Sequence, residues 1–332
     1  MRYTLYADPR WVKESYGLNP GLQSPIKWND LPPVMHSGLT NWGRVFKGHY
    51  HMPMTVDEYG NYDVIHVNMT PKNVGMIGRI RRHLAEVERE KWPKIVANTD
   101  HAIDMWVGYE RIDLLREDLL KADALFSVEP VMAGSLALLT DREVTVCPHP
   151  TNVDQLREKY GKMKNTDPFN KRTILVVSHP YDQNYIVPTL VVQELKKDMP
   201  DLAAILIGQV QKDGAWLRSV YDEWYESVQF PVMMEVVSRA NVVVDTAITH
   251  SYGRLPVECA AVGTPCVADR NVASARDLFT GLCVDVHDGS DITGSVRMAL
   301  SDPKGFMPDD STVDYYGYAK RREQFEVMIN GK

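Results

Sequence analysis

Apolar and polar positions in the first half of the chain alternate in a way that predicts strands and helices in turn. Short apolar runs typical of buried strands occur at residues 2–7, 63–68, 94–98, 124–128 and 143–147. Between the later runs, Ile112, Leu115 and Leu119 recur at helical spacing, and residues 130–139 form a second helical pattern. This alternation indicates βαβ units on a parallel sheet. Residues 9–60 have no clear period, and we expect long loops there, at the carboxyl edge of the sheet where ligands bind.

A second alternation follows a polar stretch. It begins with an apolar run at 173–177, continues with a helical pattern over 187–195, and reaches a further strand at 202–207 that ends at Gly208. The tail at 312–329 is again helical. We therefore expect a first α/β domain at 1–155, a linker at 156–171, a second α/β domain at 172–310, and a C-terminal helix at 311–332 that packs back on the first domain.

Composition narrows the class of protein. A chain of 332 residues is long enough for two α/β domains, and 44% hydrophobic with 24% charged residues is typical of globular proteins. No apolar run approaches the roughly 18 residues of a membrane span, and the N-terminus is too polar for a signal peptide. The four cysteines have no metal-like spacing, which favours reduced core thiols in a cytoplasmic protein. The net charge of −7 disfavours a general nucleic-acid binder, whereas peripheral contact with a membrane stays open.

Residues 249–269 are the most informative stretch of the chain. A β-rich run at 241–246 is followed by a polar loop, a short helix that starts near Gly253, and a Gly-Thr-Pro step into another strand. Backbone N–H groups at a helix start approached through glycine form an anion site of phosphate size. Glu258 lies about one helical turn further on, at a distance suited to a ribose diol. The stretch predicts a nucleotide-sugar pocket.

Four segments together resemble a known enzyme family. They are Ala122-Asp-Ala-Leu-Phe-Ser-Val128, Pro148-His-Pro-Thr-Asn-Val-Asp154, His250-Ser-Tyr-Gly-Arg-Leu-Pro-Val-Glu258 and Gly263-Thr-Pro-Cys-Val-Ala268. Each is similar to a motif of the retaining, family-four (glycogen-synthase-like, group 1) glycosyltransferases. The resemblance implies a GT-B fold, in which two Rossmann-like βαβ domains face a central cleft and the C-terminal helix returns to the first domain. It also implies a metal-independent hexosyltransferase without a cofactor, which uses a nucleoside diphosphate sugar as substrate.

The resemblance assigns donor-binding roles in the second domain. The segment 250–258 matches the family's E-x7-E motif, whose second glutamate binds the nucleotide ribose, so Glu258 takes that role. His250 replaces the first glutamate, which lies against the donor sugar, and a neutral imidazole still hydrogen-bonds a hydroxyl. The donor would also contact His179, Gly208, Ser251, Tyr252 and Gly253.

One departure from the family concerns the diphosphate. The family has an arginine and a lysine five residues apart after the first strand of the second domain, where this chain has His179 and Asn184. One lost donor to a developing charge typically costs about 3–4 kcal/mol. Arg254 at the helix start replaces the missing charge, or the enzyme is slow, or activity has been lost.

Candidate residues on the acceptor side follow the strand at 94–98. Asn98-Thr-Asp-His101 resembles a family segment whose histidine faces the transferred sugar, so Asp100 and His101 are the candidates. His49 and His51 alternate onto one face of a strand, but no cysteine or carboxylate completes a metal set nearby. The basic group at 72–82 is either a site for an anionic acceptor or a solvated helix face.

Two rival functions remain. A non-catalytic GT-B protein that binds a nucleotide or a partner would explain the missing cations. A nucleotide-sugar 2-epimerase, which shares the fold, would need an Asp-Ser-Gly-Gly turn and paired glutamates, and Asp245-Thr-Ala-Ile248 followed by a single Glu258 fits that poorly. The sequence therefore predicts a retaining glycosyltransferase with an unknown acceptor. The resemblance implies that the departing phosphate takes the acceptor proton, so no protein nucleophile is needed.

Overall fold

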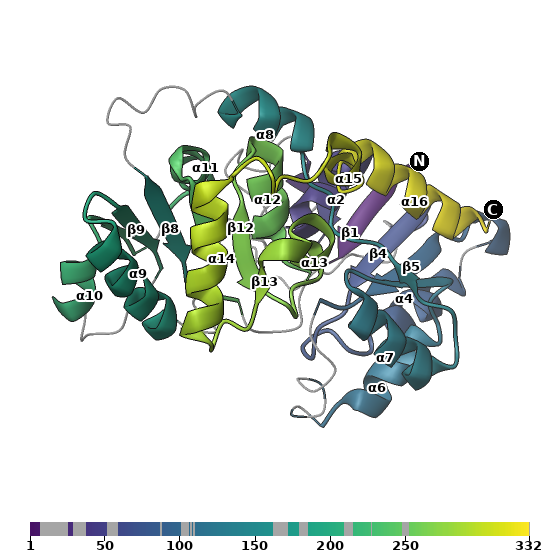
Figure 1. Cartoon of the computed structure of the whole chain (residues 1–332). Helices are drawn as coiled ribbons and strands as arrows, with labels where there is room; N and C mark the ends of the chain where they lie inside the picture. The colour runs from purple at the N-terminus through teal and green to yellow at the C-terminus, as the bar shows by residue number, and fades with distance from the viewer. Residues whose placement is uncertain are drawn as a thin grey trace. The chain divides into compact units, whose positions relative to one another are not determined.

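The computed structural model of the chain shows two compact α/β units. The described residues are 1–6, 26–28, 38–51, 59–86, 88–100, 106, 108, 110–161, 172–178, 185–208, 215–226, 228–247 and 252–331. The first unit comprises Met1–Pro150 together with Tyr318–Lys332, and the second comprises Thr151–Gly317. Figure 1 shows the elements of both units.

The sheet of the first unit has seven strands among the described residues, in the order β2-β3-β1-β4-β5-β6-β7. The strands are β1 (Tyr3–Tyr6), β2 (Ile26–Lys27), β3 (His49–His51), β4 (Val64–Asn68), β5 (Lys94–Asn98), β6 (Ala124–Ser127) and β7 (Thr145–Val146). Only the β2–β3 pair is antiparallel among these described strands. Every residue of β1 and β4 is buried, as expected for a parallel sheet covered on both faces.

Helices cover both faces of this sheet. They are α2 (Gly38–Phe46), α4 (Met76–Leu84), α6 (Ile112–Leu119), α7 (Pro130–Thr140) and α16 (Tyr318–Asn330). Right-handed crossovers from β4 to β5, β6 and β7 place α4, α6 and α7 side by side on one face, whereas the crossover in the other direction places α2 on the opposite face. The C-terminal helix α16 packs against α2.

A cluster of aromatic side chains explains why α16 belongs to the first unit. Phe325 of α16 is fully buried, and its ring centroid lies 5.0 Å from that of Trp42 and 5.1 Å from that of Phe46. Tyr3 and Phe126 of the sheet complete the cluster at 6.0 and 5.9 Å from Phe325. The last helix of the chain therefore completes the core of the first unit.

The second unit has a sheet of six parallel strands in its described part, in the order β10-β9-β8-β11-β12-β13. The strands are β8 (Thr173–Val177), β9 (Ala203–Ile207), β10 (Glu223–Tyr225), β11 (Val242–Asp245), β12 (Cys266–Asp269) and β13 (Cys283–Val284). The helices are α8 (Val153–Tyr160), α9 (Ile186–Asp198), α10 (Ala215–Val220), α11 (Phe230–Arg239), α12 (Arg254–Val262), α13 (Ala273–Leu278), α14 (Gly289–Ser301) and α15 (Asp310–Asp314). Helix α14 packs on α9, and α12 packs on α8 and α11. The described helices of the two units include none long and apolar enough to cross a bilayer.

The structure differs from the expected elements in three places. Residues 38–46 form α2, although long loops are expected over 9–60. The apolar residues of this helix recur at helical spacing, but the polar residues Thr40 and Asn41 are buried as well, so the sequence pattern is not clearly amphipathic. Helix α8 covers the first residues of the expected linker. The tail contains two helices, α15 and α16, of which only α16 belongs to the first unit.

The four cysteines are free thiols, as expected from their spacing. Burial raises the pKa of Cys147 to about 12 and that of Cys283 to about 11. The pKa of Cys266 is also raised, first by burial and then by the adjacent Cys259 thiol. These thiols therefore stay protonated and behave as packing groups at neutral pH.

Candidate functional site

In the second unit, the start of helix α12 has the geometry of an anion site. Gly253 precedes the helix with φ 73°, and a Cβ at this position would lie 2.1 Å from Cγ1 of Val272, so only glycine fits. As the N-cap residue, Gly253 has no side chain that could cap the helix start. The positive end of the helix dipole favours an anion at this position, although Pro256 in the first turn contributes no N–H group.

Three other helix starts are closed by carboxylates of the chain itself, whereas the N-cap residues of α6, α9, α11 and α13 provide no side-chain cap. Asp118 of α6 accepts hydrogen bonds from the N–H groups of Gly75 (2.6 Å) and Gly78 (3.1 Å) at the start of α4. Glu129 accepts from Val131 (2.8 Å) at the start of α7, and Asp288 accepts from Ser290 (2.9 Å) at the start of α14. Helix α12 differs from these three because its first turn has no such carboxylate.

Glu258 and Arg254, which the sequence analysis treats as separate candidates, form an ion pair one helical turn apart. Nε of Arg254 lies 2.6 Å from Oε1 of Glu258, whose side chain is only 2% exposed. The guanidinium also lies over the ring of Phe230, 5.7 Å from its centroid. The ribose role expected for Glu258 comes from the resemblance, and the structure adds a partner within the chain. The pair places one buried carboxylate and one partly exposed cation beside the helix start.

The other donor-side candidates lie at the same edge of the sheet or outside the described residues. Gly208 follows β9, where its carbonyl accepts a hydrogen bond from Nε1 of Trp224 at 3.1 Å. Ser178 follows the adjacent strand β8, and its hydroxyl is buried without a hydrogen-bond partner in the described part of the chain. Tyr252 is buried, and its ring packs against Tyr316 at 5.9 Å between centroids. Its side chain is therefore part of the packing within the second unit.

Three histidines and one serine proposed from the sequence cannot be placed. His101, His179, His250 and Ser251 lie outside the described residues.

In the first unit, Asp100 lies directly beyond β5 at the carboxyl edge of the sheet. Its Oδ1 accepts a hydrogen bond from Nδ2 of Asn98 at 2.7 Å, and its Oδ2 lies 3.2 Å from Nε2 of His149. The side chain of Asp100 is 28% exposed, whereas that of His149 is 9% exposed. Asp100 therefore presents a partly accessible carboxylate that two neighbours hold in place.

Two chains of hydrogen bonds converge on this carboxylate. Nε1 of Trp42 donates to Nδ1 of His149 at 3.1 Å, so the proton of the neutral imidazole is on Nε2, which faces Asp100. On the other side, the Tyr3 hydroxyl lies 2.6 Å from Nδ1 of His66, and Nε2 of His66 lies 2.7 Å from Oδ1 of Asn98. With Asn98 donating onward to Asp100, every donor in both chains points toward the carboxylate.

His149 is a residue of this network that the sequence analysis missed as a candidate. A Cβ on Gly38 would lie 2.2 Å from Cδ2 of His149, so the first residue of α2 packs directly on the imidazole. Position after the last strand of the unit is the only signal in the sequence that points to His149. Its partners Trp42 and Asp100 are too distant in the chain for spacing to reveal the contact.

Acid is expected to weaken the first unit through His66. Burial lowers the pKa of His66 from 6.5 to about 4, against the opposing effects of the Asn98 hydrogen bond and the Asp100 charge. In the unfolded chain His66 takes up a proton near its ordinary pKa, so stability falls as pH drops from about 6.5 toward 4, by on the order of 2–3 kcal/mol. Urea unfolding of wild type and His66→Gln across this range measures the effect. The variant should show a shallower dependence, whereas the exposed control His287→Gln should retain the wild-type slope; an unchanged slope in His66→Gln contradicts the assignment.

Of the two histidines considered for a metal site, only the side chain of His49 is among those described. Nδ1 of His49 lies 3.0 Å from the Tyr62 hydroxyl. Within the described part of the chain, no three histidine, cysteine or carboxylate side chains are grouped so that they would hold a metal ion.

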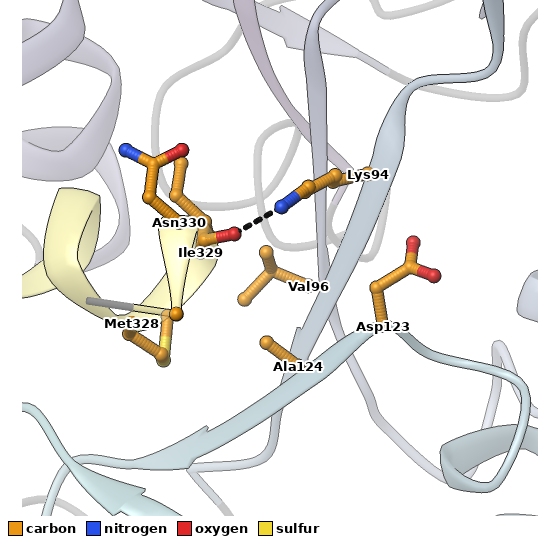
Figure 2. A pocket seen from close by; sticks show the side chains of 8 residues that line it. Lys94, Val96, Asp123, Ala124, Met328, Ile329 and Asn330 are labelled. Atoms are coloured by element: carbon orange, nitrogen blue, oxygen red, sulfur yellow. Dashed lines mark hydrogen bonds between the residues drawn. The ribbon is translucent and has the colours of Figure 1, made fainter. Parts of the chain in front are cut away.

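A hollow at the amino edge of the first sheet is lined by Lys94, Asp123 and the end of α16 (Figure 2). Its volume is about 210 Å³. Nζ of Lys94 donates to the carbonyl of Ile329, and Asp123 accepts from the Ile95 N–H at 2.6 Å and pairs with Arg81 at 2.8 Å. The charged side chains that line the hollow therefore bind other parts of the chain, and Lys94 links the sheet to α16. The hollow is not assigned as a ligand site.

The chain is similar to known proteins in three-dimensional structure. Neither a protein-family model nor a curated protein sequence matches the chain significantly. An α,α-trehalose-phosphate synthase (UDP-forming) from Burkholderia xenovorans, solved with glucose-6-phosphate, has a TM-score of 0.64 at 12% identity, over 80% of this chain and 72% of that one. HepE (Alr3699) from Anabaena, solved with UDP-glucose, has a TM-score of 0.61 at 13% identity, over 83% and 81%.

A third similar structure overlaps this chain over its whole length. It is a trehalose-6-phosphate synthase solved in a study of glycosyl transfer with retention, with a TM-score of 0.66 at 11% identity, over 100% of this chain and 99% of that one. These likenesses show that the chain has the GT-B fold, which confirms the fold expected from the sequence.

Proposed function

We propose that the protein is a retaining glycosyltransferase that moves a sugar from a nucleoside diphosphate sugar to an acceptor. The observation that supports this most is the glycine-preceded start of α12, with Gly253, Arg254 and Glu258 close together on a GT-B fold. Structures of similar fold were solved with UDP-glucose or glucose-6-phosphate. A sugar nucleotide has a diphosphate for the helix start and a ribose diol for a carboxylate, which matches this set of groups.

In this proposal the second unit binds the donor. The N–H groups at the start of α12 hydrogen-bond the diphosphate, and the Arg254 guanidinium, 31% exposed, supplies a positive charge beside it. Glu258 retains its ion pair with Arg254 and accepts hydrogen bonds from the ribose diol with its remaining lone pairs. The ion pair holds the buried carboxylate in place before the nucleotide arrives, so its acceptor oxygens need no reorganisation.

The first unit would bind the acceptor through Asp100. A carboxylate that already receives two hydrogen bonds and is partly exposed accepts a further one from a sugar hydroxyl. Both chains of donors orient Asp100 without supplying a nucleophile or a mobile proton. This suits retention by attack on the same face, in which the departing phosphate takes the acceptor proton. His101 and His250 stay candidates for contacts with the transferred sugar.

Calorimetric titration with UDP, GDP and ADP, and then with their glucose conjugates, tests the donor site. One nucleotide should bind with a dissociation constant in the micromolar range, and Glu258→Ala should weaken it by tenfold or more, because at least one charged hydrogen bond to the ribose is lost. Glu235→Ala, an exposed carboxylate on α11 of the same unit, is the matched control and should bind like wild type. No binding of any nucleotide would rule out the transferase.

A second measurement separates a transferase from a nucleotide-binding protein without catalysis. With the nucleotide sugar that binds, release of nucleoside diphosphate should depend on an added sugar or sugar-phosphate acceptor, and Asp100→Ala should abolish that dependence while leaving nucleotide affinity unchanged. Tight nucleotide binding with no release in the presence of any acceptor would instead support the binding protein.

A further inference from the structure

We propose that Asn68 and Thr70, at the carboxyl edge of the first sheet near Asp100, form a subsite that binds the hydroxyl groups of an uncharged polyol. The inference deepens the proposed function: it rests on the assignment of Asp100 to the acceptor, and it names the chemical class of the part that binds here. It also adds two residues to the candidate site, neither of which the sequence analysis considered.

Two buried polar groups at this edge have no hydrogen-bond partner in the described part of the chain. They are Oδ1 of Asn68, the last residue of β4, and the hydroxyl of Thr70 two positions later. Asn68 is only 4% exposed and Thr70 only 7% exposed. A buried polar atom without a partner costs free energy, and nearly all such atoms in native proteins find one. Their position side by side in the chain indicates a ligand, because a ligand would satisfy both at once.

The register of the sheet places the side chain of Asn68 close to the group that holds Asp100. Strands β4 and β5 are parallel neighbours (Figure 1), and Asn68 is paired directly with Asn98. Paired residues project from the same face of a sheet, so the two amide side chains lie next to each other. Nδ2 of Asn98 donates to Oδ1 of Asp100 at 2.7 Å. The amide of Asn68 is therefore a neighbour of the hydrogen bond that positions the Asp100 carboxylate.

The loop after β4 is held by another residue, Asn73. Its Oδ1 accepts from the N–H of Thr70 at 2.7 Å, and its Nδ2 donates to the carbonyl of Asn68 at 2.8 Å. Both of these bonds are made to backbone groups of Asn68 and Thr70. The fold of the loop therefore does not require the two side chains, which leaves them for a ligand.

The chemistry of the three side chains favours hydroxyl groups over an anion. The Asp100 carboxylate only accepts hydrogen bonds, whereas the Thr70 hydroxyl accepts and donates. The Asn68 amide presents an acceptor or, when turned over, a donor. A ligand hydroxyl both donates and accepts, so it satisfies each of these groups, but a phosphate or carboxylate would be repelled by Asp100. Adjacent strands lie about 4.8 Å apart, a separation that suits two hydroxyls of one sugar or cyclitol ring.

Saturation-transfer difference NMR of the full chain tests the proposal without any nucleotide. The probes are D-glucose, D-mannose, D-galactose and myo-inositol, of which at least one should bind at millimolar concentration, and inorganic phosphate should not displace it. Asn68→Leu and Thr70→Val should each weaken this binding by about tenfold, because each removes a hydrogen bond to the ligand. Neither variant should lower the midpoint of urea unfolding, since neither group has a partner among the described residues.

The control is Thr140→Val, which changes another buried threonine of the first unit. The hydroxyl of Thr140 already donates to the carbonyl of Leu136 at 2.7 Å, so this variant should bind the polyol like wild type. Thr70→Val keeps the test decisive if Asn68→Leu fails to fold, because valine and threonine have nearly the same shape. No binding of any of the four polyols, displacement by phosphate, or wild-type binding by the folded variants overturns the proposal. So does a lower unfolding midpoint in both variants, because the two groups would then serve the fold through ordered water.

The outcome for the subsite can be separated from the outcome for the proposed function. Polyol binding that depends on Asn68 and Thr70, in a protein that binds no nucleotide, would contradict the transferase and leave a polyol site. Nucleotide binding that depends on Glu258, in a protein that binds no polyol, would contradict the subsite and leave the donor site.

Discussion

Replacing Phe325 by alanine should lower the free energy of unfolding of the first unit by about 4 kcal/mol. Phe325 is fully buried and lies between Trp42 and Phe46 of α2 on one side and Tyr3 and Phe126 of the sheet on the other. Truncation removes the buried contacts of the ring and leaves a cavity, which the four rigid rings around it cannot fill by relaxing. The C-terminal helix loses its main contact with the core at the same time.

Urea unfolding and native-state hydrogen exchange measure this effect. The exchange of amides in α16 and α2 should speed up together in Phe325→Ala, because the two helices share the cluster. Val327→Ala changes a half-exposed residue of the same helix and should shift stability by well under 1 kcal/mol. Equal effects of the two substitutions would mean that α16 is not part of the core of the first unit.

The second large effect is expected at Arg254. Arg254→Ala should destabilise the second unit by about 3–4 kcal/mol, because it leaves the Glu258 carboxylate, only 2% exposed, without its counterion. Glu258→Ala alone should cost less, since Arg254 is partly exposed and its guanidinium can turn toward water. The double variant should recover much of the loss in Arg254→Ala.

A double-mutant cycle in urea separates this structural role from ligand binding. The coupling energy between Arg254 and Glu258 should exceed about 1 kcal/mol in the absence of nucleotide. The exposed Arg239→Ala in α11 is the control for loss of an arginine in the same unit. If Arg254→Ala were as mild as Arg239→Ala and the two sites were additive, the buried pair would contribute nothing to folding. Glu258 would then have to be explained by the ligand alone.

The Arg254–Glu258 pair also shows where sequence reasoning was incomplete. Residues four apart on a helix share a face, so the spacing alone permitted the contact. From the sequence, Glu258 was assigned to the ribose and Arg254 to the diphosphate, and a contact between the two side chains was not predicted. Both roles remain proposals, and the structure adds an ion pair that offsets the desolvation cost of burying the Glu258 carboxylate.

Other contacts were out of reach of the sequence. His149 meets Asp100 and Trp42 only because β5, β7 and α2 come together at one edge of the sheet. Asp118 closes the start of α4 from the neighbouring helix, and Phe325 reaches Trp42 from the far end of the chain. In each case the partners are separated by tens to hundreds of residues, and no local pattern relates them.

Local patterns were sufficient for the parallel strands of both units, whereas the GT-B fold was expected from the family resemblance. Apolar runs bounded by polar residues specified the parallel strands, because a strand buried on both faces must be apolar throughout, and Gly253 with the helix after it indicated the anion site. The tertiary structure alone decided which charges are paired, which helix starts are closed, and which unit the last helix completes. These features depend on side chains from distant segments meeting in space, and hydrophobic periodicity contains no information about such meetings.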